Sequence, residues 1–208
     1  MIVRQIPVGP MMNMSYLIVC EKTRAAAVVD AAWESNTIGR ALEQERGKLT
    51  YLLCTHGHDD HVNLVAEWLD RFPESTAVCH ERERIPAPRS RTKLVKDSDL
   101  MTMGEIDIRC LHTPGHTPGS VTYIAGGHAF FGDTLFSGED CGRVDFYREG
   151  PEEMALSLQK IRKLPDDLVV CSGHKYGAYD TTTLKFEKEN NRALRCRTLE
   201  EFLEFKSF

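Results

Sequence analysis

The chain has 208 residues, of which 41% are hydrophobic and 27% charged, a composition typical of a globular protein rather than a disordered or fibrous one. Its formal net charge of -5 at pH 7 disfavours binding to nucleic-acid phosphates. The first residues lack the pattern of a secretory signal, and no apolar stretch approaches the ~20 residues of a membrane span. We therefore expect one cytoplasmic domain, residues 1–208, with neither nucleic acid nor membrane as a partner.

The first third of the chain reads as strands alternating with helices. Runs rich in β-branched residues predict strands at residues 2–8, 15–20, 25–30 and 50–55. Apolar residues at helical spacing predict helices at residues 35–47 and 61–72, the second ended by Pro73. Residues 56–61 are then expected to form a loop between a strand and a helix.

The remaining residues continue this mixture of strands and helices. A strand is expected at residues 76–79, followed by a surface segment at 80–96 that contains two prolines. Later strands are predicted at residues 106–111, 120–125, 128–131 and 168–171, and helices at 151–164, 182–195 and 199–205. Because the elements alternate without a break in composition, the sequence predicts a layered α/β domain.

The seven cysteines show no CxxC spacing and no regular disulfide framework. Most of them end strand-like runs, as Cys20, Cys54 and Cys110 do. A free thiol packs there as a small hydrophobic group, so we expect reduced cysteines.

A dense group of metal-binding residue types follows the strand at 50–55. The segment Thr55-His56-Gly57-His58-Asp59-Asp60-His61 places imidazoles and carboxylates in one short window. Neutral imidazole suits zinc and iron, and carboxylate oxygens can complete or bridge a coordination sphere. Because the window lies in a loop, its side chains can converge on one point at the edge of a sheet.

Three later turns each offer one further ligand-type residue beside glycine. They are Gly115-His116-Thr117-Pro118-Gly119-Ser120, Gly132-Asp133-Thr134-Leu135-Phe136 and Ser172-Gly173-His174. Each of these alone would be an ordinary turn residue. The remaining histidines, His80, His112 and His128, have no such setting, and we interpret them as structural or exposed.

The order HxHxDH, His, Asp, His resembles the signature of the metallo-β-lactamase superfamily. This resemblance implies the metallo-β-lactamase fold, a four-layer αββα sandwich. It also implies a first metal site formed by His56, His58 and His116. A second metal site would be formed by Asp60, His61 and His174. Asp133 would bridge the two metal ions.

The resemblance implies two zinc ions per chain, with iron or manganese as possible alternatives. Two cations a few ångströms apart lower the pKa of a shared water and leave a bridging hydroxide as nucleophile. Asp60 would then also be catalytic, because its carboxylate can orient the nucleophile by accepting a hydrogen bond.

Two further positions resemble the glyoxalase II branch, the hydroxyacylglutathione hydrolases. In that branch a basic residue after Cys-Gly and a tyrosine two positions after the last metal histidine help to hold glutathione, which implies substrate contacts for Arg143 and Tyr176. The implied activity is hydrolysis of a small thioester. Full-length enzymes of that branch carry a C-terminal helical domain that we do not expect here, and basic residues near the C-terminus could replace its contacts, namely Arg192, Arg195 and Arg197.

Other branches of the superfamily remain alternatives. Cys141-Gly142-Arg143-Val144-Asp145-Phe146 also resembles the persulfide dioxygenases, which use one iron, although Val144 stands where threonine is typical. Lactonases, zinc β-lactamases and phosphodiesterases share the fold, as do non-catalytic scaffold modules. The basic segment 82–96 is expected to be a solvated loop rather than a site for a long polyanion.

Overall fold

Two six-stranded sheets lie at the centre of the computed structural model, which describes residues 1–206. The first sheet contains, in order, β1 (Ile2–Val8), β2 (Asn13–Val19), β3 (Ala25–Val29), β4 (Lys48–Leu53), β5 (Thr76–His80) and β6 (Thr92–Val95). The second contains β7 (Leu100–Met103), β8 (Ile106–His112), β9 (Val121–Ala125), β10 (His128–Gly132), β11 (Val169–Ser172) and β12 (Thr182–Thr183). Both sheets are mixed, because β3 to β6 run parallel, as do β10 and β11, whereas the other neighbours are antiparallel.

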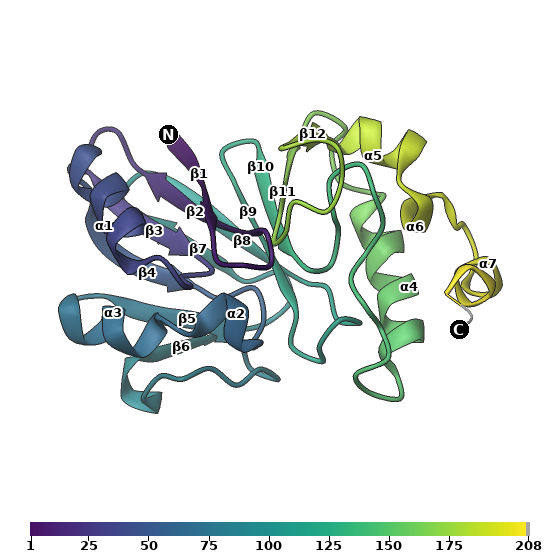
Figure 1. The fold of residues 1–208 in the computed structure, drawn as a ribbon, viewed down its shortest axis with the longest axis horizontal. Coiled ribbons are helices and arrows are strands. Elements are labelled where there is room, and N and C mark those ends of the chain that lie inside the picture. Colours follow the sequence, from purple (N-terminus) through teal and green to yellow (C-terminus); the bar gives the residue numbers. More distant parts are fainter. Residues whose placement is uncertain (207–208) are drawn as a thin grey trace.

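Helices cover the outer face of each sheet, which gives four layers (Figure 1). On the first sheet lie α1 (Ser35–Gln44) and α3 (Val65–Arg71), preceded by the short α2 (Asp59–Val62). On the second lie α4 (Gly150–Ile161), α5 (Leu184–Asn190) and α6 (Arg192–Arg195), and α7 (Leu199–Phe205) packs against α4. This architecture confirms the predicted α/β class and the αββα sandwich.

Three apolar clusters hold these layers together. The inner faces of the two sheets meet in a cluster that includes Tyr16, Tyr123 and Phe130. Trp68 belongs to the cluster between the first sheet and its helices, and Phe131 to the one between the second sheet and α4 to α7. Strand β2 is buried along its whole length, because its alternate side chains enter two different clusters.

Several element boundaries differ from the prediction. The expected loop 56–61 is correct only in its first half, since α2 begins at Asp59 and the acidic first turn suits a helix N-terminus. The expected surface segment 80–96 ends in β6, an edge strand that pairs parallel with β5. The expected helix 182–195 is instead β12, α5 and α6, because buried Asn191 ends α5 and caps the N-terminus of α6 through Oδ1.

The strand directions bring the loops with polar motifs to one edge of the sandwich. Strands β3, β4 and β5 are parallel, so their carboxyl ends lie together, and the turn between β1 and β2 is at the same edge. In the second sheet β8, β10 and β11 share a direction, so their following loops also meet. An isolated bridge between Asn13 and His174 joins the two sheets at this edge.

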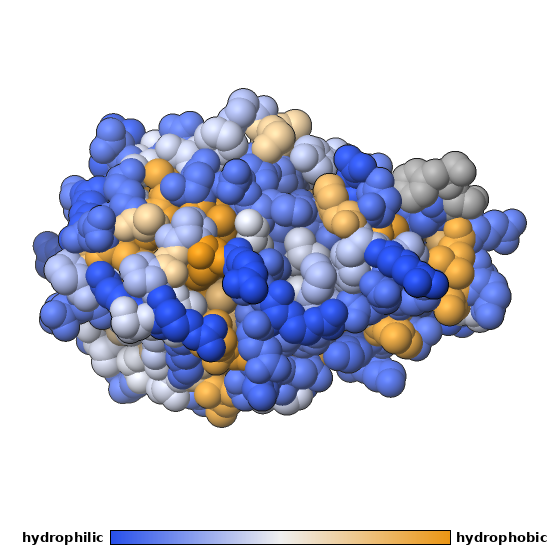
Figure 2. Space-filling model, turned by 90° about the horizontal axis from the view of Figure 1, so that it is seen from below, coloured by the Kyte–Doolittle hydropathy of each residue, from blue (hydrophilic) through white to orange (hydrophobic). Residues whose placement is uncertain are grey.

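The surface is polar over most of the face seen from below, where apolar patches are separated by hydrophilic side chains (Figure 2). Across residues 1–206 no helix combines the length and apolar character needed to cross a membrane.

Candidate metal centre

The edge where the two sheets meet brings together the ligand-type residues expected from the sequence. One group consists of His56, His58 and His116, which each offer one nitrogen atom within 4.8 Å of the other two. A second group consists of Asp60, His61 and His174, whose three ligand atoms also lie within 4.8 Å of one another. The first sheet supplies His56 to His61 from the segment after β4, and the second supplies His116 and His174 from the loops after β8 and β11.

Asp133, which follows β10, lies between the two groups. Its Oδ2 is 3.5 Å from His116 Nε2 and 3.4 Å from His174 Nε2, and its Oδ1 is 3.4 Å from His61 Nε2. The carboxylate therefore touches histidines from both groups, as expected for a bridging position.

Hydrogen bonds on the outer side of the rings fix which nitrogen faces the centre. His116 Nδ1 donates to the Arg143 carbonyl at 2.9 Å, and His174 Nδ1 donates to the Met11 carbonyl at 2.8 Å, since a carbonyl can only accept. His61 Nδ1 likewise faces Asp30 Oδ2 at 3.0 Å. In the neutral rings Nε2 is then a bare lone pair directed into the centre, the arrangement that second partners impose on metal-binding histidines.

These lone pairs face one another at distances that require a cation or a proton between them. His61 Nε2 and His174 Nε2 are 3.1 Å apart, and His116 Nε2 is 3.0 Å from His58 Nδ1. Within the described residues 1–206, His56 Nε2 and Asp133 Oδ1 are buried without a hydrogen-bond partner. Buried polar atoms are rarely left unpaired, so this donor set fits bound metal ions.

The electrostatic environment differs between the two groups. Burial lowers the pKa of His56 well below its usual value and also lowers those of His58 and His116, so these rings are neutral donors. For His174, burial is outweighed by the carboxylates of Asp133 and Asp60, which raise its pKa to about 10. The second group thus sits in a strongly negative environment that favours a bound cation.

The carboxylates themselves stay ionised. Burial would raise the pKa of Asp133, but His61 and His174 lower it overall. For Asp60 burial acts in the same way, whereas hydrogen bonds from His174 and Asn13 and the charge of His61 hold its pKa well below the usual range. Both carboxylates can therefore act as anionic ligands at neutral pH.

Asp30 and Asn13 are part of this site, although the sequence analysis did not single them out. Buried Asp30, directly after β3, accepts hydrogen bonds from Thr55 N at 2.8 Å and Thr55 Oγ1 at 2.7 Å, besides the one from His61. Thr55 Oγ1 lies 3.1 Å from His56 Nδ1, so one carboxylate orients a histidine from each group. Asn13 Nδ2 donates to Asp60 Oδ2 at 2.9 Å. The only sequence signal was the position of Asp30 at the end of a strand.

The residues expected to hold substrate lie at the rim of the centre. The Tyr176 ring stacks on His174 with centroids 4.7 Å apart and is 49% exposed. The Arg143 side chain is exposed and pairs with Asp145 at 2.7 Å, with its guanidinium 4.9 Å from the centre of the Phe146 ring. Phe146, which was not singled out, packs its edge on His58 and His116 at 4.9 and 5.2 Å.

Two of the basic residues near the C-terminus, Arg195 and Arg197, lie elsewhere. Arg195 and Arg197 line a cavity of about 650 Å³ with Arg162, at the end of α4. Helix α4 begins beside the candidate metal centre, where Gly150 approaches the Gly115 carbonyl, and its 12 residues extend about 18 Å. The structure therefore does not support these arginines as contacts to a substrate at the metal centre.

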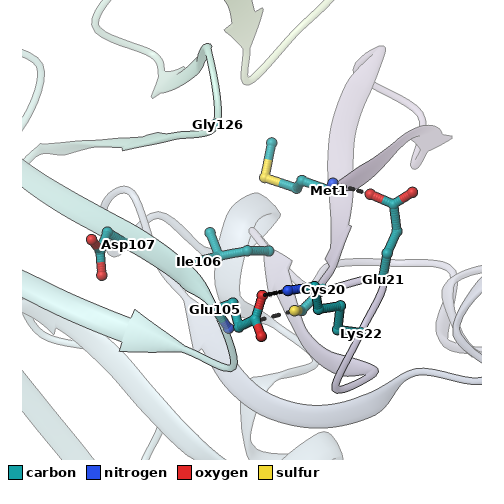
Figure 3. A pocket seen from close by; sticks show the side chains of 8 residues that line it. All are labelled: Met1, Cys20, Glu21, Lys22, Glu105, Ile106, Asp107 and Gly126. Carbon is teal, nitrogen blue, oxygen red and sulfur yellow. Dashed lines mark hydrogen bonds and ion pairs between the residues drawn. The ribbon is translucent and has the colours of Figure 1, made fainter.

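The structure has another cavity, of about 420 Å³ (Figure 3). It is lined by Met1, Cys20, Glu105 and neighbouring residues. Cys20 follows the end of β2, whereas Asn13 begins β2 at the candidate centre, so the two sites are roughly 20 Å apart. The cavity is thus separate from the candidate metal centre.

Comparisons with known proteins cover the part of the chain that carries the candidate ligands. A family model described as the metallo-beta-lactamase superfamily matches residues 8–174. The chain is 39% identical over 198 residues to a protein named hydroxyacylglutathione hydrolase from Bradyrhizobium sp., covering 90% of this chain and 72% of that protein. It superposes on a metallo-beta-lactamase from Staphylococcus aureus with a TM-score of 0.89 and 26% identity, covering 99% of this chain and 66% of that one. For ETHE1 from Myxococcus xanthus the TM-score is 0.85 and the identity 29%, covering 99% of this chain and 89% of that one.

Proposed function

We propose, from the premise that this chain belongs to the metallo-β-lactamase superfamily, that it hydrolyses a small thioester of the acylglutathione type. The chain is a metallo-hydrolase by its similarity to proteins named hydroxyacylglutathione hydrolase. The proposal concerns the substrate, the metal ions and the residues that bind them.

The observation that carries the proposal is the convergence of two ligand groups on Asp133. His56, His58 and His116 would hold one ion, Asp60, His61 and His174 a second, and Asp133 would bridge both. Imidazole and carboxylate donors suit two zinc ions, with iron or manganese as alternatives. Ions bound there would lower the pKa of water and make hydroxide available at neutral pH.

Asp60 is proposed as the residue that orients the nucleophile. Its Oδ2 lies 3.4 Å from His174 Nε2 and accepts a hydrogen bond from the Asn13 side-chain amide, while the Asp60 side chain remains 18% exposed. Because neighbouring groups keep it ionised, Asp60 can accept a hydrogen bond from the attacking water without itself becoming protonated. Asn13 would keep the carboxylate at the right angle for this contact.

The rim residues would bind the thiol part of the substrate. The Arg143 guanidinium is suited to a carboxylate of a glutathione-like group, and the exposed Tyr176 ring offers an apolar surface and a hydroxyl. Phe146 would exclude water from one side of the centre, because its ring packs edge-on against His58 and His116.

Metal analysis combined with two activity assays tests the proposal. We expect two zinc ions per chain and turnover of S-lactoylglutathione that is lost on chelation and restored by zinc. Arg143→Gln should raise KM. The matched control is Arg109→Gln, which removes an exposed charge from within β8. A zinc-loaded protein that does not cleave thioesters would contradict the substrate class.

A second candidate is an iron-dependent persulfide dioxygenase. The observation in its favour is that residues 141–146 lie against the first ligand group, because the Arg143 carbonyl accepts a hydrogen bond from His116 Nδ1 at 2.9 Å and the Phe146 ring packs on His58. This segment resembles that branch in sequence. One iron per chain, together with oxygen uptake on glutathione persulfide and no thioester cleavage, would support this candidate instead.

A further inference from the structure

A short segment that begins at the last residue of β5 lies between the two loops that hold the first ligand group. We call residues 80–84 the strap. A Cβ atom on Gly57 would lie 2.8 Å from Glu83 Oε1 and would also meet the Arg84 carbonyl. A Cβ on Gly119 would lie 2.6 Å from both the Cβ and the backbone nitrogen of Glu83. The strap thus touches both loops so closely that only glycine fits at these two positions.

Glu83 forms the polar contact within this arrangement. Its Oε2 accepts a hydrogen bond from Thr117 Oγ1 at 2.5 Å, and its Oε1 accepts one from Arg84 N at 3.1 Å. Thr117 is adjacent to His116, and its hydroxyl also lies 2.8 Å from Ser120 Oγ across the same turn. The carboxylate therefore fixes the turn that carries His116.

Two other contacts join the strap to the second sheet and its helix. His80 stacks on His112 with ring centroids 3.7 Å apart and an interplanar angle of 5°. Arg82 Nη1 lies 3.0 Å from Glu153 Oε1 on α4. These contacts hold the strap in place, so the Glu83 carboxylate is presented from a fixed backbone.

We propose that Glu83 is a positioning residue that sets the separation between the His56–His58 loop and His116. The inference rests on the proposed metal centre. It adds that Glu83 determines the affinity of the ion at the first site, but not that of the ion at the second. Within residues 1–206 the hydrogen bonds of the Glu83 side chain go to Thr117 and Arg84 only. The Asp60, His61 and His174 group is held by Asn13, Asp30 and Met11 instead. Loss of Glu83 should therefore weaken the first site selectively.

The test measures zinc affinity of each site by competition with a chromophoric chelator. In Glu83→Ala we expect one of the two bound ions to weaken by about 10–100-fold, the usual effect of removing a partner behind the ligands. The second ion should keep its affinity. Glu81→Ala is the matched control, since Glu81 lies in the strap but points to exposed Lys96 at 3.2 Å, and it should bind both ions as the unaltered chain does.

Two further variants assign the effect to a site. Adding Glu83→Ala to His116→Ala should cause little additional loss, because the first group is already incomplete, whereas adding it to His174→Ala should weaken the remaining ion. Thr117→Val removes the partner hydroxyl and should reproduce the effect of Glu83→Ala, which keeps the test valid if the latter folds poorly. Equal weakening of both ions, or unchanged affinity in Thr117→Val, would overturn the inference. Failure of the unaltered chain to bind zinc would instead contradict the proposed function.

Discussion

Replacing Asp30 by asparagine is the perturbation that most sharply tests how the candidate ligands are oriented. Asparagine keeps one oxygen, which can still accept the hydrogen bond from Thr55 N. In place of Oδ2, however, it has an amide NH2 group, which cannot accept the hydrogen bonds that Thr55 Oγ1 and His61 Nδ1 donate to Asp30. Hydrogen bonds to a charged group contribute about 1.5–3 kcal/mol each, so we expect the metal-free protein to lose about 3 kcal/mol of unfolding free energy.

The same substitution should also weaken metal binding. His61 is oriented directly by Asp30, and His56 is oriented through Thr55, so both ions are affected, in contrast to the effect expected for Glu83. Loss of such a partner reduces metal affinity by about 10–100-fold.

Urea denaturation of the metal-free protein and chelator competition of the loaded protein measure the two effects. Asp70→Asn, an exposed position on α3, is the control and should change the unfolding free energy by no more than about 0.5 kcal/mol. If Asp30→Asn bound both ions with the affinity of the unaltered chain, the orienting role assigned to this carboxylate would be refuted.

Three further outcomes are expected. Asn13→Ala removes the amide that holds the proposed catalytic carboxylate, so kcat should fall by about 10–100-fold with KM nearly unchanged; an effect on KM alone in steady-state kinetics would argue against this role. Trp68→Ala empties a fully buried position under the first sheet and should cost about 3–5 kcal/mol in chemical denaturation, while a cost below 1 kcal/mol would mean that the packing is misassigned. A hydrogen bond from Thr23 lowers the pKa of Cys20, which is 4% exposed in the lining of a cavity, to about 7, whereas burial raises that of Cys171 to about 12, so alkylation of Cys20 should increase as the pH rises through 7. Peptide mass spectrometry after iodoacetamide treatment checks this, and equal labelling of Cys171 would contradict it.

The candidate ligands could be predicted from the sequence because they lie in local motifs. His56, His58 and His61 occur within one short window, whereas the turns around His116 and His174 are ordinary in themselves and were assigned through the resemblance of the whole motif order to the superfamily signature. Strand order then brings these motifs to one edge, since the strands that precede them run in a common direction.

The residues that orient these ligands could not be found in the same way. Asp30, Asn13 and Glu83 act through contacts with residues far along the chain, and each is an ordinary turn or strand-end residue in its local sequence. The break at Asn191 was missed for a related reason, because its side chain is held by the distant Phe136 carbonyl at 3.0 Å. Edge strand β6 is short and has few apolar residues, so it becomes recognisable as a strand only through its pairing with β5.

Zinc stoichiometry of the unaltered chain and of Asp133→Ala tests the central claim most directly. Asp133 lies within 3.5 Å of histidines from both ligand groups, so its removal leaves the two cations without their shared anionic ligand. After removal of all metal and titration with zinc, the unaltered chain should bind two equivalents tightly and Asp133→Ala at most one, with thioesterase activity lost. Two tightly bound equivalents in Asp133→Ala, or full activity of the unaltered chain after exhaustive chelation, would contradict the account.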